Sequence, residues 1–251
     1  MTEDRGALLV TGGGRGIGAA TARMAAAKGW AVAVNYVEAK DRADALVAEI
    51  ERAGGRAAAF QADVGDPDQI VPLFDATERR LGKLTGLVNS AGRVGRSSPL
   101  IDCDPTEVIR TVELNLTGLI LATREAIRRM AKSRGGKGGA VVNISSAAAT
   151  LGSTGEFVWY AATKAGVDIF TEGVAREVAT DGVRVNAVSP GMIDTEIHAS
   201  AGDPGRVARF VPLLPMKRAG SPEEVAEAIL WLLSDAAGYV TGANIRVAGG
   251  R

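Results

Sequence analysis

The chain has 251 residues, of which 46% are apolar, and its 29 Lys and Arg residues balance its 29 Asp and Glu residues. This length suits one α/β domain with a large core, so we expect residues 1–251 to form a single domain. Balanced charge without blocks of one sign argues against nucleic acid and membrane surfaces as partners.

The N-terminal stretch and the cysteine content indicate a cellular compartment. MTEDRGALLVTGG contains no signal-peptide apolar region, and Cys103 is the only cysteine, so no internal disulfide can form. No apolar run approaches the roughly 20 residues that a membrane span needs. We therefore expect a soluble protein of the cytoplasm.

Short β-branched runs alternate with Ala-rich helical stretches along the whole chain. Near-continuous apolar strands separated by helices are typical of a parallel sheet covered on both faces. The sequence therefore predicts the α/β class, with a doubly wound, seven-stranded parallel sheet and helices on both faces. The expected strands are 7–11, 31–36, 57–63, 85–90, 140–145, 183–189 and 244–249.

A glycine-rich run, TGGGRGIG, follows the first expected strand and opens a helix. Glycines permit a tight turn and close approach to a pyrophosphate, which then lies on the N-terminal N–H groups of the helix. A turn that only packs a helix is the alternative, but the position after the first strand favours dinucleotide binding. The predicted cofactor contacts in this loop are Gly12, Gly14, Arg15, Gly16, Ile17 and Gly18.

The end of the second expected strand, AVNYVEAKDR, bears on which dinucleotide binds. Asn35 and Tyr36 occupy the place where an NAD site usually has an acidic residue. Arg15 is the candidate partner for a 2′-phosphate, with Lys40 or Arg42 as possible helpers. A solvated loop charge is the alternative interpretation of Arg15. The pattern favours NADP(H), with Asn35 and Tyr36 among the cofactor contacts.

Tyr160 and Lys164 lie four positions apart in VWYAATKAG, a spacing that puts both side chains on one helix face. Such a pair occurs by chance in many helices. A free tyrosine has a pKa of about 10, and a nearby lysine ammonium would favour the phenolate form. The pair alone does not decide between a catalytic and a structural role.

Six ordered motifs do decide it: TGGGRGIG, LVNSAG, LNLTG, VVNISS, YAATK and VNAVSPGMIDT. In order and spacing they resemble the short-chain dehydrogenase/reductase family, over essentially the whole chain. The chain is most similar to the branch that contains 3-oxoacyl-carrier-protein reductases and glucose 1-dehydrogenases. The resemblance implies a single-domain Rossmann fold. It also implies NADP(H)-dependent hydride transfer to or from a carbonyl or secondary alcohol, in a 3-oxoacyl thioester, sugar or small ketone.

The same resemblance assigns catalytic roles. Tyr160 would exchange a proton with the substrate oxygen, Lys164 would also bind the nicotinamide ribose, and Asn115 would help to carry a water chain from the lysine. Ser146 would hold the substrate oxygen, with Ser145 as the competing candidate.

The usual family spacing would place the serine at Ala147, so alignment through NISS implies one inserted residue before the tyrosine. The remaining implied cofactor contacts are Asp63, Val64, Asn89, Ala91, Gly92, Pro190, Gly191, Ile193 and Thr195.

Residues 192–216 form a long polar connection with Pro and Gly, which is typical of a lid. Glu156 and His198 are candidate substrate contacts, and no second His or Cys offers a metal site. Helices expected over 106–131 and 160–179 carry apolar residues on more than one side. With the resemblance, this predicts a homotetramer built on two-fold contacts.

A different functional class is also open. The chain could be a non-catalytic NADP-sensing binding protein on the same fold. The complete set of Ser146, Tyr160, Lys164 and Asn115 argues against it, because a sensor needs no proton donor.

Overall fold

The computed structural model describes residues 5–251, apart from the side chain of His198. It has one seven-stranded parallel sheet in the order β3-β2-β1-β4-β5-β6-β7, which confirms the predicted fold class. The strands are β1 (Ala7–Thr11), β2 (Ala31–Tyr36), β3 (Arg56–Gln61), β4 (Leu84–Asn89), β5 (Gly139–Ile144), β6 (Val183–Pro190) and β7 (Asn244–Val247).

Helices connect the strands. The α-helices are α1 (Gly16–Ala27), α2 (Lys40–Arg52), α3 (Pro67–Leu81), α4 (Pro105–Val112), α5 (Leu119–Met130), α6 (Ala148–Leu151), α7 (Val158–Val178), α8 (Ile197–Ser200), α9 (Arg206–Phe210) and α10 (Pro222–Leu233). A π-helix, η2 (Glu113–Gly118), joins α4 to α5. The 3₁₀ turns are η1 (Leu100–Asp102), η3 (Lys132–Arg134), η4 (Ala179–Asp181), η5 (Val211–Leu213) and η6 (Asp235–Ala237).

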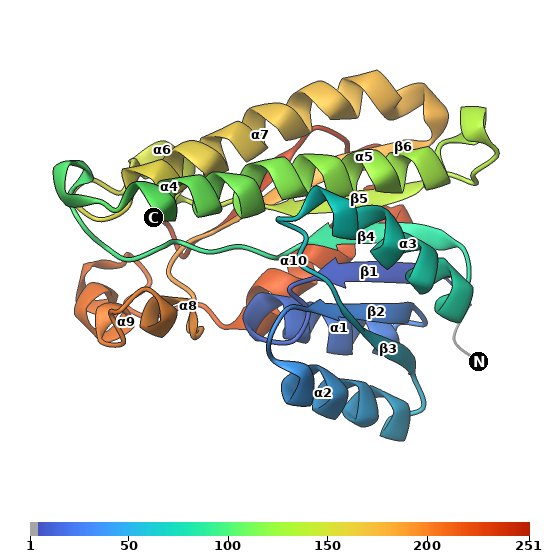
Figure 1. Cartoon of the computed structure of the whole chain (residues 1–251), viewed down its shortest axis with the longest axis horizontal. Coiled ribbons are helices and arrows are strands. Elements are labelled where there is room, and N and C mark those ends of the chain that lie inside the picture. Colours follow the sequence, from blue (N-terminus) through green and yellow to red (C-terminus); the bar gives the residue numbers. More distant parts are fainter. Residues whose placement is uncertain (1–4) are drawn as a thin grey trace.

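The sheet is the middle of three layers. Helices α1, α2 and α10 pack on one face through residues such as Leu46 and Ile229, and α3, α5 and α7 pack on the other through Phe74 and Met130 (Figure 1). Central strands such as β1, whose residues are all buried, therefore meet apolar side chains on both sides. Both faces must be covered because a parallel sheet places its crossover helices on them.

Several predicted boundaries were wrong by a few residues. β3 ends at Gln61, β4, β5 and β7 end earlier than predicted, and β6 extends to Pro190, which pairs with Val247. The single helix expected over 106–131 is divided into α4, η2 and α5. A π-turn of this kind within a helix is frequent at functional sites.

A buried polar network connects β4 and β5 to the helices above them. The Asn89 amide donates to Thr123 Oγ1 and Asn143 Oδ1, both at 2.9 Å, and the Asn143 amide donates to Thr171 Oγ1 at 3.0 Å. Because buried polar groups need partners, this network aligns β4 and β5 at one register. Residues that follow both strands, such as Ala91 and Ser146, line the cleft described below.

Candidate active site

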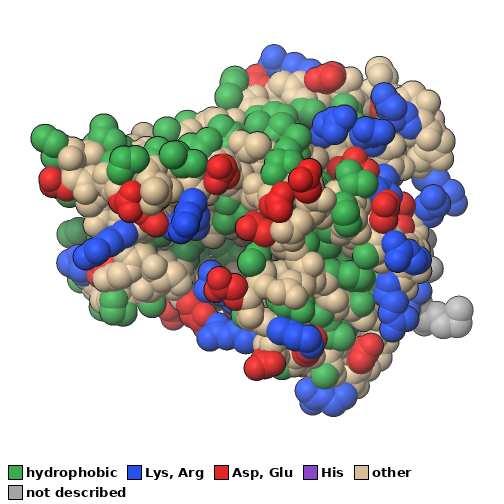
Figure 2. All heavy atoms as spheres, in the orientation of Figure 1, with side chains coloured by type: hydrophobic (Ala, Val, Ile, Leu, Met, Phe, Trp, Pro, Cys, Tyr) green, Lys and Arg blue, Asp and Glu red, His purple; other side chains and the backbone are tan. Residues whose placement is uncertain are grey.

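A cleft of about 1,200 Å³ opens where the strands end. All strands are parallel, so the segments after β1, β2, β3, β4, β5 and β6 meet at one edge of the sheet and line it. Figure 2 shows the hollow between the lid segment and the body of the molecule. Ligand pockets are usually about 300–1,000 Å³, so this cleft has room for a dinucleotide together with a second small molecule.

The glycine loop forms one wall of the cleft. Gly12 has a φ of +62°, and a Cβ there would lie 2.8 Å from Ala91 Cα, so the loop after β1 packs directly on the loop after β4. A side chain at Gly18 would overlap the main-chain oxygen of Gly12. Gly18 does not line the cleft; the absence of a side chain there lets α1 pack under the loop. The loop residues that do line the cleft are Gly12, Gly14, Arg15, Gly16 and Ile17.

Asn35 borders the cleft, and its side chain also has a structural use. Its side chain is buried, accepts a hydrogen bond from Gly12 N at 3.2 Å and donates to Ala62 O at 2.9 Å. Asn35 borders the cleft, but its amide is occupied in joining the glycine loop to β2 and β3. The rim beyond β2 is formed by Tyr36, Val37, Glu38 and Ala39, and no acidic side chain stands at either of the last two positions of the strand.

The cations predicted near this rim are placed differently from one another. Arg15 is exposed and lines the cleft. Lys40 bonds Asp44 one turn along α2, and Arg42 pairs with Glu196 at the start of the lid segment. Neither Lys40 nor Arg42 lines the cleft, so their prediction as helpers is not supported by the geometry.

The segments after β3 and β4 complete this half of the cleft. Asp63 lines it, and its carboxylate accepts a hydrogen bond from Gly65 N at 2.8 Å, which fixes the side chain at the turn. Val64, Ala91 and Gly92, which are expected cofactor contacts, also line it. Asn89 does not line it, because its side chain lies in the buried network below.

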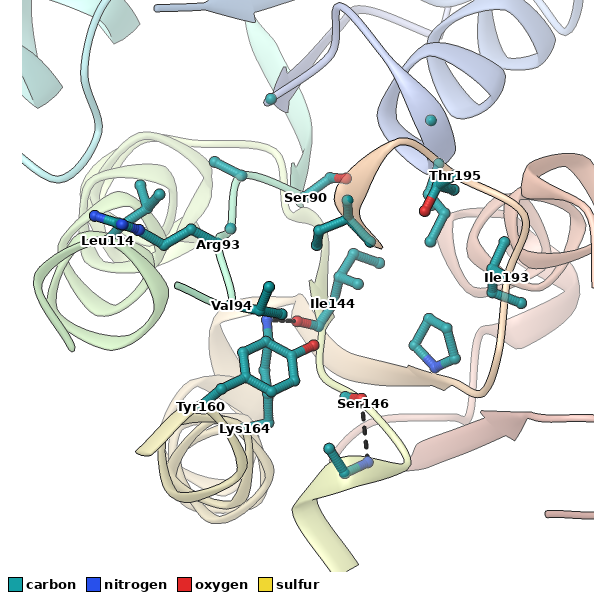
Figure 3. A pocket seen from close by; sticks show the side chains of 18 of the residues that line it. Ser90, Arg93, Val94, Leu114, Ile144, Ser146, Tyr160, Lys164, Ile193 and Thr195 are labelled. Atoms are coloured by element: carbon teal, nitrogen blue, oxygen red, sulfur yellow. Dashed lines mark hydrogen bonds between the residues drawn. The ribbon is translucent and has the colours of Figure 1, made fainter. Parts of the chain in front are cut away.

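Ser146, Tyr160 and Lys164 lie together at the centre of the cleft, from the end of β5 and the first turns of α7. Figure 3 shows their side chains facing one space, with Ile193 and Thr195 across it. The Ser146 hydroxyl accepts a hydrogen bond from Ala148 N at 3.1 Å, and its nearness to the Tyr160 hydroxyl favours the charged form of the phenol. Ser145 also lines the cleft, but its hydroxyl donates to Lys164 O at 3.1 Å. Between the two serines, the geometry therefore selects Ser146.

Burial dominates the electrostatics of the tyrosine and the lysine. Burial raises the pKa of Tyr160, while the hydroxyl of Ser146 and the charge of Arg206 oppose the rise. Burial lowers the pKa of Lys164 to about 8, opposed by the charge of Asp168. The expectation that Lys164 would bring the pKa of Tyr160 down toward working pH was wrong, because burial raises that pKa. The Lys164 ammonium lies beside the phenol ring and donates to Ile144 O at 2.6 Å.

Asn115 is buried in the π-helix η2, behind the lysine. Its amide bonds the main chain of Arg93 in both directions, with Nδ2 donating to Arg93 O at 2.7 Å and Oδ1 accepting from Arg93 N at 2.9 Å. It also donates weakly to Thr163 Oγ1, at 3.4 Å. Asn115 thus connects the catalytic half of the cleft to the loop after β4, and it does not line the cleft itself.

The segment after β6 closes the far side. Gly191 N donates to Val247 O at 2.9 Å, so the main chain is held against β7 as it leaves the sheet. The methyl group of Thr195 lies above Gly16 of the glycine loop. Pro190, Gly191, Ile193 and Thr195, which are expected to cover the nicotinamide, all line the cleft.

The sequence did not indicate how residues 192–216 would contact the cleft. Arg206 of α9 is buried and bonds both carboxylate oxygens of Glu156, and its second nitrogen lies 2.7 Å from Glu156 Oε2. Its guanidinium lies over the rings of Phe157 and Phe210. Both charged residues line the cleft, together with Phe210 and Arg251. The side chain of His198 is outside the described part of the chain.

Known proteins are similar to this chain over nearly its whole length, from the glycine loop to the C-terminus. The family model described as Enoyl-(Acyl carrier protein) reductase matches residues 12–251. The chain is a short-chain dehydrogenase/reductase. As a member of this family it is an oxidoreductase that uses a nicotinamide dinucleotide.

Two curated members of the family are similar over nearly their full length. The uncharacterized oxidoreductase YgfF of Escherichia coli is 49% identical, over 97% of this chain and 98% of its own. A 3-oxoacyl-[acyl-carrier-protein] reductase of Synechocystis is 42% identical, over 96% and 95%.

A crystal structure has the same fold: a short-chain dehydrogenase from Burkholderia cenocepacia in complex with NADP. Its TM-score to this chain is 0.90, at 32% identity, and the match covers 99% of this chain and 98% of that one.

Residues 5–251 contain neither a membrane-spanning helix nor a cluster of metal ligands. No helix there is both long and apolar enough to cross a bilayer. The described His, Cys, Asp and Glu side chains form no group of three that could hold a metal ion.

Proposed function

We propose that this short-chain dehydrogenase/reductase is an NADP(H)-dependent enzyme that interconverts a carbonyl compound and its secondary alcohol. The observation that carries the proposal is that the Ser146 and Tyr160 hydroxyls face the same cleft as the glycine loop. A cofactor in that loop and a carbonyl on the two hydroxyls would lie side by side.

The residues of the cleft fit a dinucleotide. Gly12 and Gly16 both have positive φ, and the loop precedes the N-terminus of α1, where N–H groups and the helix dipole attract phosphate. Asp63 and Val64 would border the adenine, and Ile193 and Thr195 would cover the nicotinamide. The chemistry that the cofactor supplies is hydride transfer to or from the substrate carbon.

Arg15 supports NADP(H) over NAD(H). It is exposed at the rim beside Tyr36, and the end of β2 lacks the acidic side chain that accepts the ribose hydroxyls in NAD sites. A guanidinium matches a 2′-phosphate by charge and by its forked donor geometry. The Burkholderia cenocepacia relative, whose structure contains NADP, agrees with this preference.

Proton transfer is the work of the chain's own side chains. Burial keeps the Tyr160 hydroxyl protonated, which suits it to donate to a substrate oxygen as negative charge develops there. Ser146 would donate a second hydrogen bond to the same oxygen. Lys164 places a cation beside the phenol ring, and this cation would stabilise the phenolate left after proton transfer.

The wall around these hydroxyls supports a carbonyl substrate with an apolar body. Leu151, Phe157, Met192 and Phe210 line this end of the cleft. The charges of Arg206 and Glu156 are paired with each other, so neither requires a charged group on the substrate. Among 3-oxoacyl thioesters, sugars and small ketones, the two less polar classes fit this wall better than a sugar does.

The lid, the assembly and the compartment belong to the same proposal. Residues 192–216 contribute to the cleft wall through α8 and α9, which supports a role as a substrate lid. Figure 2 shows hydrophobic side chains over α4, α5 and α7, where Ile109, Val112 and Ile169 are exposed. A partner subunit packed on this face would bury these side chains, and we infer a homotetramer that includes such a contact. We infer that the enzyme acts in the cytoplasm.

A substrate screen tests the function. Ketones, 3-oxoacyl thioesters and sugars would be offered with NADPH or NADP+, and absorbance at the nicotinamide band would be followed. We expect turnover of at least one carbonyl compound by the parent protein. Tight NADPH binding without turnover across the panel would instead favour a cofactor-sensing protein.

A further inference from the structure

Asp168 is a charged residue in the catalytic region to which no role has been given above. It lies on α7, one turn beyond Lys164 and two turns beyond Tyr160, so the three share a helix face. Its Oδ1 atom is buried and has no hydrogen-bond partner among the described residues. A buried, unpartnered carboxylate oxygen is costly to the fold and therefore indicates a function.

The groups that face Asp168 come from three elements. Lys164 precedes it on α7, Ser145 follows β5, and Arg246 lies on β7. Ser145 interacts with the carboxylate and also donates to Lys164 O at 3.1 Å. One hydroxyl proton cannot serve both acceptors at once. Within residues 5–251, Asp168 makes no ion pair within 4.0 Å. The charge of Asp168 therefore acts on the Lys164 ammonium through the protein interior, without direct contact.

We propose that Asp168 is a positioning residue of the active site, which keeps the Lys164 ammonium charged from behind and, through Ser145, aligns the first turns of α7 with the end of β5. The proposal rests on the function proposed above, in which Lys164 must be a cation. Asp168 does not line the cleft, so it would act through Lys164 and Ser145 and not on the substrate or cofactor directly.

The electrostatics agree with this arrangement. Burial lowers the pKa of Lys164 to about 8, and the charge of Asp168 is what opposes the fall. Burial raises the pKa of Asp168 itself, whereas Ser145, Lys164 and Arg246 favour its charged form. Tyr160 is protonated and contributes no charge, so Asp168 is the anion that acts on the lysine.

The Asp168→Asn variant tests the proposal, because it keeps the shape and removes the charge. With the best ketone and saturating NADPH, kcat would be measured from pH 6 to 10. Without the carboxylate, Lys164 loses its proton more readily, so the alkaline midpoint of the profile should move down by about one pH unit. Asp168→Glu should restore most of the shift. The matched control, Glu172→Gln, removes a charge one turn further along α7 and should leave the midpoint unchanged.

Ser145→Ala provides a second variant if Asp168→Asn does not fold. Without the hydroxyl the charged form of Asp168 is less favoured, so the midpoint should fall in the same direction by a smaller amount. A merely structural role for Asp168 would lower kcat equally at every pH. An unchanged midpoint in both variants would overturn the proposal.

NADPH affinity is an independent readout, because Lys164 is expected to bind the nicotinamide ribose. The Kd for NADPH would be measured by fluorescence over the same pH range. As pH rises, the affinity for NADPH should begin to weaken at a lower pH in Asp168→Asn than in the parent. A parent that turns over no carbonyl compound refutes the proposed function, while identical binding profiles in parent and variant refute the role of Asp168.

Discussion

The ammonium group of Lys164 donates a hydrogen bond to the main-chain oxygen of Ile144, at 2.6 Å. Ile144 is the last residue of β5, and Ser145 and Ser146 follow it directly. A second bond, from Ser145 Oγ to Lys164 O, joins the same two elements. The lysine and the serine that faces the cleft are therefore held at a fixed distance by main-chain anchors.

Tyr160→Phe removes the proton donor and leaves the ring in place. We expect carbonyl reduction to fall by about 10²-fold or more, because general acid catalysis contributes about 10²–10⁴-fold. NADPH affinity should change little, since the hydroxyl faces the substrate. Steady-state kinetics and fluorescence titration measure the two effects. Tyr239→Phe, at a fully exposed tyrosine, is the control; parental turnover in Tyr160→Phe would contradict the assignment.

Arg15→Ala tests cofactor choice. Loss of a charged hydrogen bond costs about 1.5–3 kcal/mol, so the Kd for NADPH should rise by roughly 10- to 100-fold, with the Kd for NADH almost unchanged. Isothermal calorimetry gives both constants. Arg80→Ala, at an exposed position on α3, should alter neither. Equal affinities of the parent for NADPH and NADH would remove the argument.

Glu156→Gln tests the pair that joins α9 to the start of α7. The buried Arg206 guanidinium would lose its counter-charge, which is strongly destabilising. We expect Tm to fall by roughly 4 °C or more, and KM for a neutral ketone to rise more than kcat falls. Asp203→Asn removes an acid from the neighbouring pair with Arg209 and is the control. The interpretation fails if both variants have the same Tm and KM.

Lys164→Met should change how stability depends on pH. The pKa of Lys164 is about 8 in the folded chain, below its ordinary value of 10.5. Between those pH values the unfolded chain binds more protons, so this group makes the folded parent more stable as pH rises. Relative to Lys164→Met, the parent should gain up to about 3 kcal/mol between pH 7 and 10. Urea unfolding measures the difference, which a pH-independent offset would contradict.

Ile169→Asp tests the assembly. Ile169 is 68% exposed on α7, and a carboxylate there would prevent an apolar partner surface from packing on the helix. Size exclusion with light scattering should give a tetramer for the parent and a smaller species for the variant. Val71→Asp, at an exposed valine of α3, should remain tetrameric. A parent that is a fully active monomer at low micromolar concentration would be the contrary result.

The parts of the fold and site that could be predicted are those with local patterns. The glycine loop follows a buried strand within a few residues, and Tyr160 and Lys164 are one helical turn apart. The spacing of the last two places them together but says nothing of their burial, which turned out to control both pKa values. That is why the expected effect of the lysine on the tyrosine was wrong.

Other parts of the site depend on contacts between distant segments. Arg206 and Glu156 are 50 positions apart, and the segment around α9 has no periodic pattern. The sequence places Asn35 at the end of β2 whether its amide contacts a cofactor or the main chain. The amide bonds the segments after β1 and β3, and the sequence does not show that these segments lie beside it. Asp168 did carry a local signal, because it is a carboxylate one helical turn beyond Lys164. It lies outside the YAATK motif, which contains only Tyr160 and Lys164.

The amide network of Asn89 and Asn143 also disfavours wrong pairings of the strands during folding. The hydrogen bond from the Asn89 amide to Asn143 Oδ1 forms only when β4 lies beside β5 with Asn89 opposite Asn143. If β4 paired with another strand, or slipped by one residue, this bond would be lost, and a buried group left unsatisfied costs about 1–3 kcal/mol. Apolar strands of similar composition would otherwise be nearly interchangeable. Two asparagines thus give this sheet an energetic preference for one strand order during folding.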